Sequence, residues 1–370
     1  MKINKVIIAP DSFKGTLSAK QAADIIAAEV KAFFPDCTVV KMPIADGGEG
    51  SVDTIIETIG GEKYYARALS PDDRQIDAVF GIAVNGTAII EMAQSSGVTK
   101  QNGLHPMTSS TYGFGQMIDA ALRRGAEDFI LCIGGSATTD GGCGMAAALD
   151  VLFVDGGGKS FVPCGGTLGA IARIDMSGID KRISESRFTV MCDVANPLFG
   201  VNGAAYIYGP QKGASPEQIL TLDEGLCHLG IILFEHFGID YVNIPGAGAA
   251  GGLGAGCMAF LGARLMSGSE AILKLCGFEE HLAGTDLIIT GEGKLDSQSF
   301  NGKVLSGILQ NARDVPVWSI CGVCECDEAL LRKYDIAVFE MNEGISTEVS
   351  MADPVKYLSI AAKKAMMAIK

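Results

Sequence analysis

The chain has 370 residues, of which 48% are hydrophobic and 48 are glycine, nearly twice the usual share of about 7%. This much apolar sequence excludes intrinsic disorder, and glycine without a three-residue period excludes collagen. The net charge of −14 argues against nucleic acid and anionic membranes as partners, because both attract basic surfaces. An acidic small ligand would therefore need a local cluster of lysines and backbone amides.

Short apolar segments alternate with helical patterns in the first sixty residues. Residues 5–9 and 38–42 are predicted strands, and each is followed by a polar turn that contains glycine. A helix is expected from about Ser18 to Phe34, and a second one ends near Ile59. Apolar strands between helices are typical of a parallel sheet that is covered on both faces.

The pattern changes in residues 62–93, where two alternating runs flank Asn85-Gly86 and predict a β-hairpin. Helices are then expected at 111–124, from about 142 and near 215–236, with strands at 129–133 and 188–192. Residues 241–263 are uncharged and long enough to cross a membrane. Their seven glycines and one proline instead favour a glycine-rich loop that leads into a helix.

Strand and helix patterns alternate again near the end of the chain, with strands at 287–290, 315–320 and 336–339. We therefore predict an α/β fold with two α/β domains and mainly parallel sheets. Residues 1–75 and 285–370 are expected to form a discontinuous domain of Rossmann or flavodoxin-like type. Residues 76–284 form a second domain inserted into it, with the active site in the cleft between the two.

Ligands of open parallel sheets bind beyond the carboxyl ends of the strands, so the residues that follow each strand are candidates. Turns and helix caps use the same residue types, but five polar strand ends in one chain favour a shared polar crevice. The five segments contain Asp11, Ser12 and Lys14; Asp46 and Glu49; residues 134–142; Asp193 and Asn196; and Glu292, Lys294 and Asp296.

Residues 129–149 are the most informative segment, because a strand, a turn without large side chains and a helix follow one another. Gly134 and Gly135 allow close approach of the backbone, and free amides at a helix start favour an anion. The hydroxyls of Ser136 and Thr138 could add donors. A phosphate cradle is the functional interpretation, and a tight structural turn is the alternative.

Two nucleotide-binding motifs are matched only in part. Residues 155–160 lack the first glycine of a P-loop, since Phe153 stands there, and a hairpin turn is predicted instead. Residues 246–251 match G-x-G-x-x-G, but Pro245 interrupts the short strand before them. The sequence contains neither a H-E-x-x-H nor a G-x-S-x-G motif. Phosphoryl transfer with Mg²⁺ fits best, because it relies on positioning and charge neutralisation rather than on a covalent nucleophile.

The eleven cysteines lie mostly in apolar runs, and their odd number indicates a reducing, cytoplasmic compartment. Cys321, Cys324 and Cys326 have a spacing that could hold a metal. No second cysteine pair and no nearby histidine follow them, so a zinc site is not favoured.

Seven segments, in chain order, carry a resemblance to a known family. They are APDSFKG (9–15), ADGGEG (45–50), GGSAT (134–138), CDVANPL (192–198), GPQKGA (209–214), GAGAAGG (246–252) and TGEGKLD (290–296). Together they resemble the glycerate kinase type 1 family of bacteria. The resemblance implies a kinase that uses ATP and Mg²⁺ to phosphorylate D-glycerate, and two α/β domains with one inserted in the other.

These segments give the expected site residues. The ATP phosphates are expected at Gly134, Gly135, Ser136, Ala137 and Thr138. The substrate is expected at Asp11, Ser12, Lys14, Asp46 and Lys212. The catalytic residues are expected to be Asp193, Lys294 and Asp296, with Asp193 and Asp46 as ligands of Mg²⁺. The family often has arginine where Lys294 stands, so the charge is kept but not the bidentate geometry.

Several alternatives stay open at this point. The resemblance favours 2-phosphoglycerate as the product, but 3-phosphoglycerate is the competing outcome. A non-catalytic phosphometabolite-binding module would also need the cradle, and a nucleotide-linked dehydrogenase would need residues 246–251 to bind a dinucleotide. The expected partner is the small substrate, without nucleic acid or membrane, and a homo-oligomer is left open.

Overall fold

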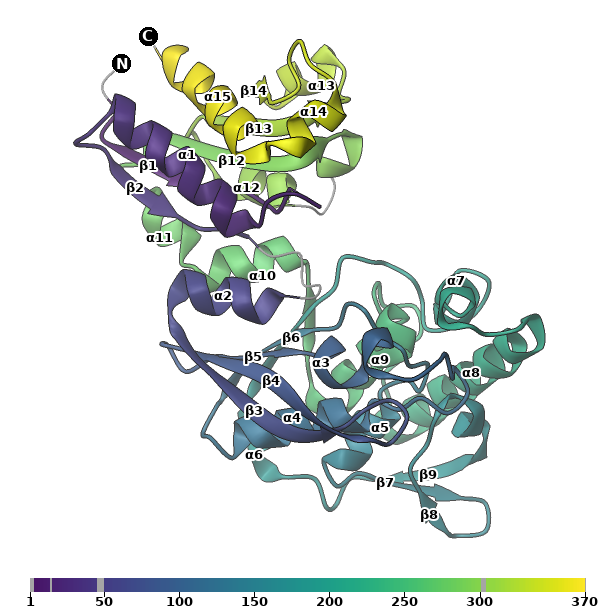
Figure 1. Cartoon of the computed structure of the whole chain (residues 1–370). Coiled ribbons are helices and arrows are strands. Elements are labelled where there is room, and N and C mark those ends of the chain that lie inside the picture. Colours follow the sequence, from purple (N-terminus) through teal and green to yellow (C-terminus); the bar gives the residue numbers. More distant parts are fainter. Residues whose placement is uncertain (1–2, 14, 45–49, 301–303, 370) are drawn as a thin grey trace. The chain divides into compact units, whose positions relative to one another are not determined.

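The computed structural model describes residues 3–13, 15–44, 50–300 and 304–369 (Figure 1). The chain divides into two compact units: unit 1 comprises residues 1–46, 57–59 and 267–370, and unit 2 comprises residues 47–56 and 60–266. Each unit contains a mostly parallel sheet with helices, which confirms the predicted α/β class with mainly parallel sheets.

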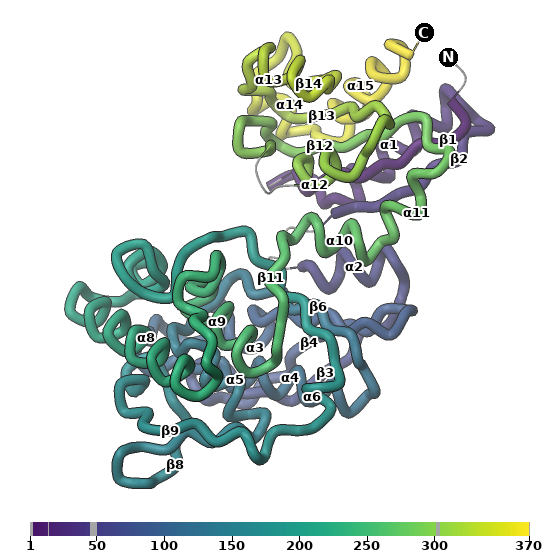
Figure 2. The backbone as a smooth tube through the Cα atoms, turned by 180° about the vertical axis from the view of Figure 1, so that it is seen from behind, coloured from purple at the N-terminus to yellow at the C-terminus, as the bar shows by residue number. Residues whose placement is uncertain are grey.

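Unit 1 is built on a parallel sheet of five strands in the order β14-β13-β12-β1-β2. The strands are β1 (Lys5–Ile8), β2 (Thr38–Lys41), β12 (Leu287–Leu295), β13 (Val317–Cys324) and β14 (Ile336–Glu340). The helices are α1 (Ala19–Phe33), α10 (Gly268–Leu275), α11 (Phe278–Leu282), η4 (Ser297–Phe300), α12 (Val304–Asn311), α13 (Glu328–Lys333), α14 (Thr347–Ala352) and α15 (Pro354–Met367). Both β1 and α15 lie in this unit, so the chain starts and finishes in it (Figure 2).

Helix α1 shows how the sequence specifies an element of this unit. The Ser18 hydroxyl accepts from the Gln21 N–H at 3.2 Å, and the Gln21 side chain accepts from the Ser18 N–H at 2.9 Å, which closes a capping box. The apolar face of the helix carries Ile26 and Val30 into a core that also includes Leu358 of α15. Helices α1 and α15 therefore lie side by side against the sheet (Figure 1).

Strand β12 is longer than expected. We predicted a strand over 287–290 and a polar turn after it, but the strand continues through Leu295, which pairs with Cys324. Glycine makes this extension feasible, because a Cβ at Gly291 would lie only 2.5 Å from the Ile320 carbonyl oxygen. The glycines and the charged residues of 291–294 are typical of a turn, yet Gly291, Glu292 and Lys294 form ladder pairs with β13.

Unit 2 contains a sheet of six strands in the order β11-β10-β6-β5-β4-β3, in which β3 and β4 are antiparallel to their neighbours. These strands are β3 (Gly61–Leu69), β4 (Gln75–Ala83), β5 (Ala88–Glu91), β6 (Asp128–Cys132), β10 (Arg187–Met191) and β11 (Arg264–Met266). A small sheet adds β7 (Leu152–Asp155), β8 (Ser160–Phe161) and β9 (Ile171–Asp175). The helices are α2 (Ser51–Ile59, whose last three residues belong to unit 1), α3 (Ala93–Ser96), η1 (Val98–Lys100), α4 (Tyr112–Leu122), α5 (Cys143–Ala148), η2 (Gly165–Ala170), α6 (Lys181–Glu185), α7 (Ala204–Tyr208), η3 (Pro210–Lys212), α8 (Pro216–Phe237) and α9 (Ala249–Leu261).

Two predicted hairpins are present in unit 2. Strands β4 and β5 pair around Asn85-Gly86, with Gly81 opposite Ile89. Strands β7 and β8 pair around the P-loop-like segment, with Val154 opposite Ser160, so that segment is a turn between antiparallel strands.

The unit boundaries differ from those expected at 75 and 284. Strand β3 pairs with β4 along its whole length, which joins residues 61–69 to unit 2. Residues 267–284 form α10 and α11 and belong to unit 1. The alternation of β3 is weak in the sequence, and its pairing with β4 assigns it to the second sheet.

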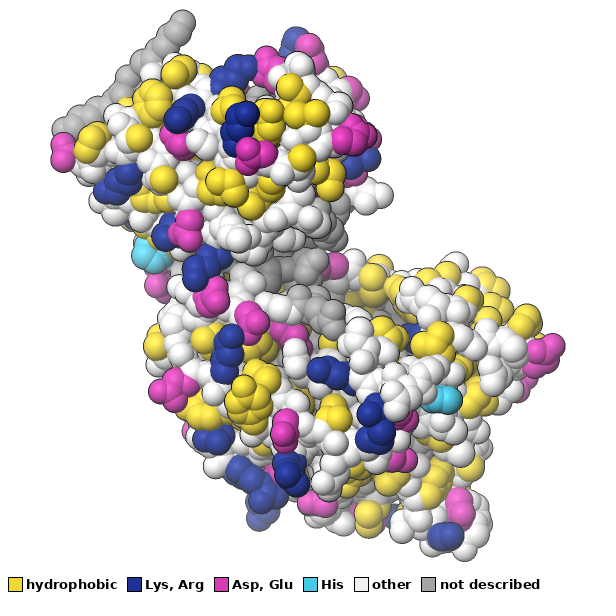
Figure 3. Space-filling view, in the orientation of Figure 1, with side chains coloured by type: hydrophobic (Ala, Val, Ile, Leu, Met, Phe, Trp, Pro, Cys, Tyr) yellow, Lys and Arg dark blue, Asp and Glu magenta, His cyan; other side chains and the backbone are white. Residues whose placement is uncertain are grey.

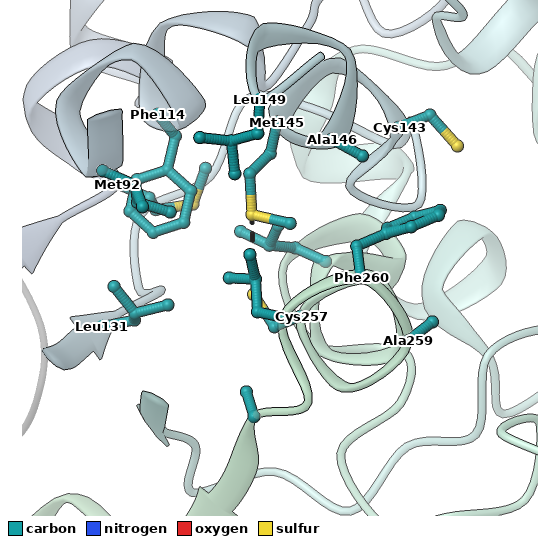
Figure 4. Packing of buried hydrophobic residues seen from close by; sticks show 14 of the residues in the cluster. Met92, Phe114, Leu131, Cys143, Met145, Ala146, Leu149, Cys257, Ala259 and Phe260 are labelled. Atoms are coloured by element: carbon teal, nitrogen blue, oxygen red, sulfur yellow. Dashed lines mark hydrogen bonds between the residues drawn. The ribbon is translucent and has the colours of Figure 1, made fainter. Parts of the chain in front are cut away.

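The core of unit 2 is packed from elements that are far apart in the sequence (Figure 4). Met145 of α5 contacts Cys257 of α9, with 3.8 Å between the two sulfur atoms, and Phe114 of α4 and Leu131 of β6 lie in the same cluster. The uncharged segment 241–263 is thus a loop followed by the buried helix α9, as predicted. Among the described residues, no helix is long and apolar enough to span a membrane.

The charged side chains of the two units are mixed in sign. On the face shown in Figure 3, lysines and arginines are interspersed with aspartates and glutamates rather than gathered in a basic patch. The ion pairs include Lys63 with Asp53 at 2.6 Å in unit 2 and Lys20 with Glu57 at 3.0 Å in unit 1.

Candidate active site

In unit 2, four parallel strands end at the same edge of the sheet. Glu91 of β5, Cys132 of β6, Met191 of β10 and Met266 of β11 stand in register. The segments that follow β6 and β10 contain residues 134–138 and Asp193, which we expected in the site. Parallel topology therefore brings two of the predicted segments to one edge, where open sheets bind ligands.

The loop of residues 134–138 is held against the segment that follows β5. The Val98 N–H donates to the Gly135 carbonyl at 3.0 Å, and the Ala137 N–H donates to the Ser96 carbonyl at 3.0 Å. Gly135 has φ of +75°, which favours glycine. Within the described part of the chain, the N–H groups of Gly134 and Gly135 form no hydrogen bond with a backbone carbonyl. The loop thus presents backbone donors, as a phosphate cradle requires.

Lys212, at the end of η3, binds this loop from within the protein. Its ammonium donates to the Ser136 hydroxyl at 2.8 Å and to the Thr138 carbonyl at 2.6 Å, and the residue is 2% exposed. Burial lowers the pKa of Lys212 to about 7, and the charge of Asp140 acts in the opposite direction. Lys212 therefore contacts the predicted phosphate loop, and its side chain is buried.

Asp140 is a buried carboxylate in the candidate segment 134–142, and our sequence analysis assigned it no specific role. Its Oδ2 accepts from the Thr111 N–H at 2.7 Å and from the Thr111 hydroxyl at 2.8 Å. The N–H groups of Gly142 and Gly144 also donate to the carboxylate, each at 3.2 Å. Burial raises the pKa of Asp140, and these donors oppose the rise. An aspartate just before a predicted helix is a capping signal that could have identified it.

Two threonine hydroxyls of the same loop lack partners. Among the described residues, the Oγ1 atoms of Thr138 and Thr139 are buried and have no hydrogen-bond partner. Unpaired buried polar atoms are costly, so such groups often mark a ligand site or a functional constraint. These two atoms are the observation that best fits a polar ligand at the loop.

The G-x-G-x-x-G segment packs on the back of the loop. Ala250, Gly251 and Gly252 all have left-handed φ values, of 53°, 74° and 88°. The Gly141 N–H donates to the Gly251 carbonyl at 3.1 Å, and a Cβ on Gly251 would lie 2.0 Å from the Thr138 carbonyl oxygen. No strand precedes the segment in residues 240–248, so the context of a dinucleotide fingerprint is absent there.

Asp193 lies two residues beyond the end of β10 and is exposed. The nearby Asn196 is fixed in orientation, because its amide donates to the Asn202 carbonyl at 2.8 Å and accepts from the Tyr208 hydroxyl at 2.6 Å. This segment therefore presents an accessible carboxylate on a loop that is anchored by Asn196.

Glu91 is a second buried carboxylate that the sequence analysis missed. It is 1% exposed and accepts from the Val52 N–H at 2.5 Å and from the Gly50 N–H at 3.3 Å, at the start of α2. Burial raises the pKa of Glu91, while these hydrogen bonds lower it. Its place at the end of a predicted alternating strand was the only signal of its role.

The remaining predicted residues belong to unit 1. The N–H of Asp11 donates to the Gly291 carbonyl at 2.8 Å, which ties the turn after β1 to β12. The Ser12 N–H donates to the Asp11 carboxylate at 2.6 Å. The parallel sheet thus places the turn that contains Asp11 and Ser12 beside β12. Lys14 and Asp46 lie outside the described residues.

Lys294 and Asp296 are engaged with other groups of unit 1. The Lys294 ammonium forms an ion pair with Glu325 at 2.7 Å, and both side chains are about half exposed. The hydrogen bond with Glu325 raises the pKa of Lys294. The Asp296 carboxylate accepts from the Gln298 N–H at 2.9 Å, and so begins η4. A substrate anion at Lys294 would compete with Glu325.

The arrangement of the potential metal-ligating side chains bears on whether the described residues form a metal centre. Among them, no group of three or more histidine, cysteine, aspartate or glutamate side chains is arranged to hold a metal ion. None of the eleven cysteines, all of which are described, forms a disulfide, and Cys321 is buried in β13.

The chain is similar over its whole length to known kinases. The profile of the Glycerate kinase family matches residues 6–370. A Glycerate kinase from Halalkalibacterium halodurans is 42% identical over 367 residues, which cover 98% of this chain and 94% of that protein. Glycerate 2-kinase from Escherichia coli is 42% identical over 349 residues, or 93% of this chain and 92% of that one. A crystal structure of a provisionally assigned glycerate kinase 2 from Salmonella typhimurium matches with a TM-score of 0.88 at 36% identity, covering 99% and 98% of the two chains. The chain therefore belongs to the glycerate kinase family and is a phosphotransferase with an alcohol group as acceptor.

Proposed function

We propose that this kinase transfers the γ-phosphoryl group of ATP, with Mg²⁺, to the 2-hydroxyl of D-glycerate and so forms 2-phosphoglycerate. The observation that carries the donor side is the loop of residues 134–138, with the N–H groups of Gly134 and Gly135, the buried hydroxyls of Thr138 and Thr139, and Lys212 behind it. The position of transfer is supported by the name of the Escherichia coli relative, a Glycerate 2-kinase. The motifs of the sequence also favour the type 1 branch of the family.

The phosphates of ATP would be held at the loop of residues 134–138, chiefly by the N–H groups of Gly134 and Gly135. Backbone N–H groups at a strand end suit phosphate oxygens, because these donors are already fixed in place. No side-chain entropy is lost when they bind the phosphate. Lys212 adds the one buried ammonium that touches this loop among the described residues. A dinucleotide at residues 246–251 is disfavoured, since that segment packs on Thr138.

Asp193 fits a magnesium ion better than a transition metal. Mg²⁺ is usually bound by one or two carboxylates together with substrate phosphates and water, so a cluster of three protein ligands is not needed. Asp193 is an exposed carboxylate at the sheet edge that contains the phosphate loop. When bound, the ion would offset negative charge on the phosphates. Asp46, the second proposed ligand, lies outside the described residues.

Asp193 is also our first candidate for the general base. The glycerate hydroxyl must lose its proton as its oxygen bonds to the phosphorus, and a carboxylate within hydrogen-bond reach can accept it. Asp296 is proposed to share contacts with this hydroxyl. Asp11, Ser12 and Lys14 are proposed to bind the glycerate, with Lys294 near its carboxylate. For Lys294, this role requires the ion pair with Glu325 to open.

Coupling the reaction to enolase decides between the two products. Enolase dehydrates 2-phosphoglycerate but not the 3-phosphate, so ATP, Mg²⁺, D-glycerate and enolase without a mutase should yield phosphoenolpyruvate. We expect phosphoenolpyruvate to form at the rate of ADP release. ADP release without it, rescued by adding the mutase, would show that 3-phosphoglycerate is the product. The absence of ADP release would refute the proposed donor and acceptor together.

The role of Asp193 is tested by Asp193→Asn, with Asp150→Asn as the matched control. Asp150 is exposed in the same unit, and its left-handed φ of 68° is one that asparagine tolerates. We expect Asp193→Asn to lower kcat by about 10²–10⁴-fold and the control to be unaffected. A fall in kcat at saturating Mg²⁺ would identify a base, whereas a higher Mg²⁺ requirement with recovery of kcat would identify a ligand. Normal turnover would remove Asp193 from the mechanism.

A further inference from the structure

Lys212 is unusual because a lysine ammonium rarely lies inside a protein without a paired carboxylate. Both of its hydrogen bonds go to the loop of residues 134–138, one to a side chain and one to the backbone two residues later. The residue is 2% exposed. The ammonium therefore spans the turn from Ser136 to Thr138 on the side away from solvent.

The charge of this ammonium is not neutralised by a direct ion pair within the described residues. Asp140 is the charged group that acts on it, and this carboxylate is already bound by Thr111, Gly142 and Gly144. Burying an unpaired charge is costly, and a protein keeps one where another interaction compensates. An anion held by the loop would supply that compensation.

We propose that Lys212 is a positioning residue, which holds the loop of residues 134–138 through Ser136 and Thr138 in the conformation that receives the nucleotide phosphates. This inference rests on the proposed function of the loop. It replaces our expectation that Lys212 binds glycerate directly, because the ammonium has committed two of its donors and is closed off from solvent.

The loop needs such an anchor because glycine gives its first residues little stiffness of their own. Gly134 and Gly135 have wide conformational freedom, and on one side the turn is fixed by Ser96 and Val98. Lys212 supplies two further bonds, to Ser136 and Thr138. Without these bonds, the loop would adopt the phosphate-binding conformation for a smaller fraction of the time. Nucleotide binding would then carry a larger loss of conformational entropy.

The test uses Lys212→Met and Ser136→Ala, singly and together, in the full-length kinase. Methionine has a similar length and is apolar, so the buried site is kept filled while the charge and the donors are lost. Lys159→Met, at an exposed residue of the β7–β8 turn, is the control for loss of a lysine. The KM for ATP, the KM for D-glycerate and kcat are measured between pH 6 and 9.

We expect Lys212→Met to raise the KM for ATP by about tenfold or more, since a hydrogen bond to a charged group is worth at least that factor. The KM for D-glycerate should change far less. Ser136→Ala should raise the KM for ATP in the wild type but have little further effect beside Lys212→Met, because the two residues act through one bond. The wild type should lose affinity for ATP as the pH rises through neutrality, and Lys212→Met should lack that dependence.

The proposal is overturned if the KM for ATP is unchanged in Lys212→Met, or if only the KM for D-glycerate rises. It is also overturned if the effects of the two substitutions multiply in the double variant. Should Lys212→Met fail to fold in thermal unfolding, Ser136→Ala alone decides: an unchanged KM for ATP refutes the anchoring role. An inactive wild type would instead refute the proposed function, so the two failures are distinguishable.

Discussion

Glu91 and Val52 are joined by a hydrogen bond of 2.5 Å, from the backbone N–H of the first turn of α2 to a buried carboxylate at the end of β5. The helix has no side-chain cap of its own, since its N-cap is Gly50 with φ of 88°. A carboxylate from the sheet thus satisfies donors that helix starts leave open. Its negative charge also suits the positive end of the helix dipole.

Replacing Glu91 with alanine should therefore destabilise unit 2. The N–H groups of Val52 and Gly50 would lose their acceptor, and we expect the free energy of unfolding to fall by about 1–3 kcal/mol. Glu127→Ala, at an exposed position before β6, serves as the control and should change stability by less than about 0.5 kcal/mol. Urea unfolding followed by circular dichroism measures both. Equal stability of the two variants would show that water caps α2 equally well.

Asp140 should be less tolerant still, because four donors converge on its buried carboxylate. In Asp140→Ala, the N–H groups of Thr111, Gly142 and Gly144 would be buried without an acceptor, and a loss of at least about 3 kcal/mol is expected. Asp140→Asn keeps one acceptor oxygen and should lose less. The comparison is made by thermal unfolding. A smaller loss for alanine than for asparagine would contradict the role of these hydrogen bonds.

The order of strands and helices could be predicted from apolar runs, glycine-rich turns and caps, because those signals are local. Asn85-Gly86 between alternating runs predicted the hairpin of β4 and β5, which the pairing of Gly81 with Ile89 confirms. Strand β3 was missed and β12 was ended too early, since both depend on a partner strand rather than on their own composition.

The burial and the hydrogen-bond partners of the site residues could not be predicted from the sequence, for the same reason. Lys212 stands in a Gly-Pro-Gln-Lys-Gly segment that is typical of an exposed turn, yet it is buried because the loop after β6 lies over it. The burial of Asp140 and Glu91 likewise depends on Thr111 and on α2, which are distant in the chain. Polar residues at strand ends can be predicted from a sequence. The neighbouring groups that determine their charge state depend on how distant segments pack together.

The stability of the folded kinase should depend on pH through Lys212. Burial lowers its pKa to about 7 from an ordinary value of 10.5, so between these values the unfolded chain binds more protons than the folded one. The free energy of unfolding should then rise with pH in this window, by at most about 1.4 kcal/mol per pH unit from this group. Below pH 7 both states are protonated, and the folded state bears the full cost of the buried charge.

Urea unfolding at pH 7, 8 and 9 checks this expectation by comparing the wild type with Lys212→Met. The difference in stability between the two should shift in favour of the wild type as the pH rises. Other groups titrate equally in both proteins and cancel in the difference. Parallel curves would mean that Lys212 keeps its proton throughout the window.

A methyl group added at Gly251 should displace the phosphate loop. A Cβ there would lie 2.0 Å from the Thr138 carbonyl oxygen, an acceptor of Lys212, and the φ of 74° is strained for alanine. Gly251→Ala should lower the free energy of unfolding by more than about 2 kcal/mol and raise the KM for ATP, because the loop must move to make room. Gly156→Ala is the matched control, since a Cβ at that position would have no atom within 4 Å and its φ is not left-handed. If Gly251→Ala behaves like this control in urea unfolding and in kinetics, residues 250–252 do not support the loop.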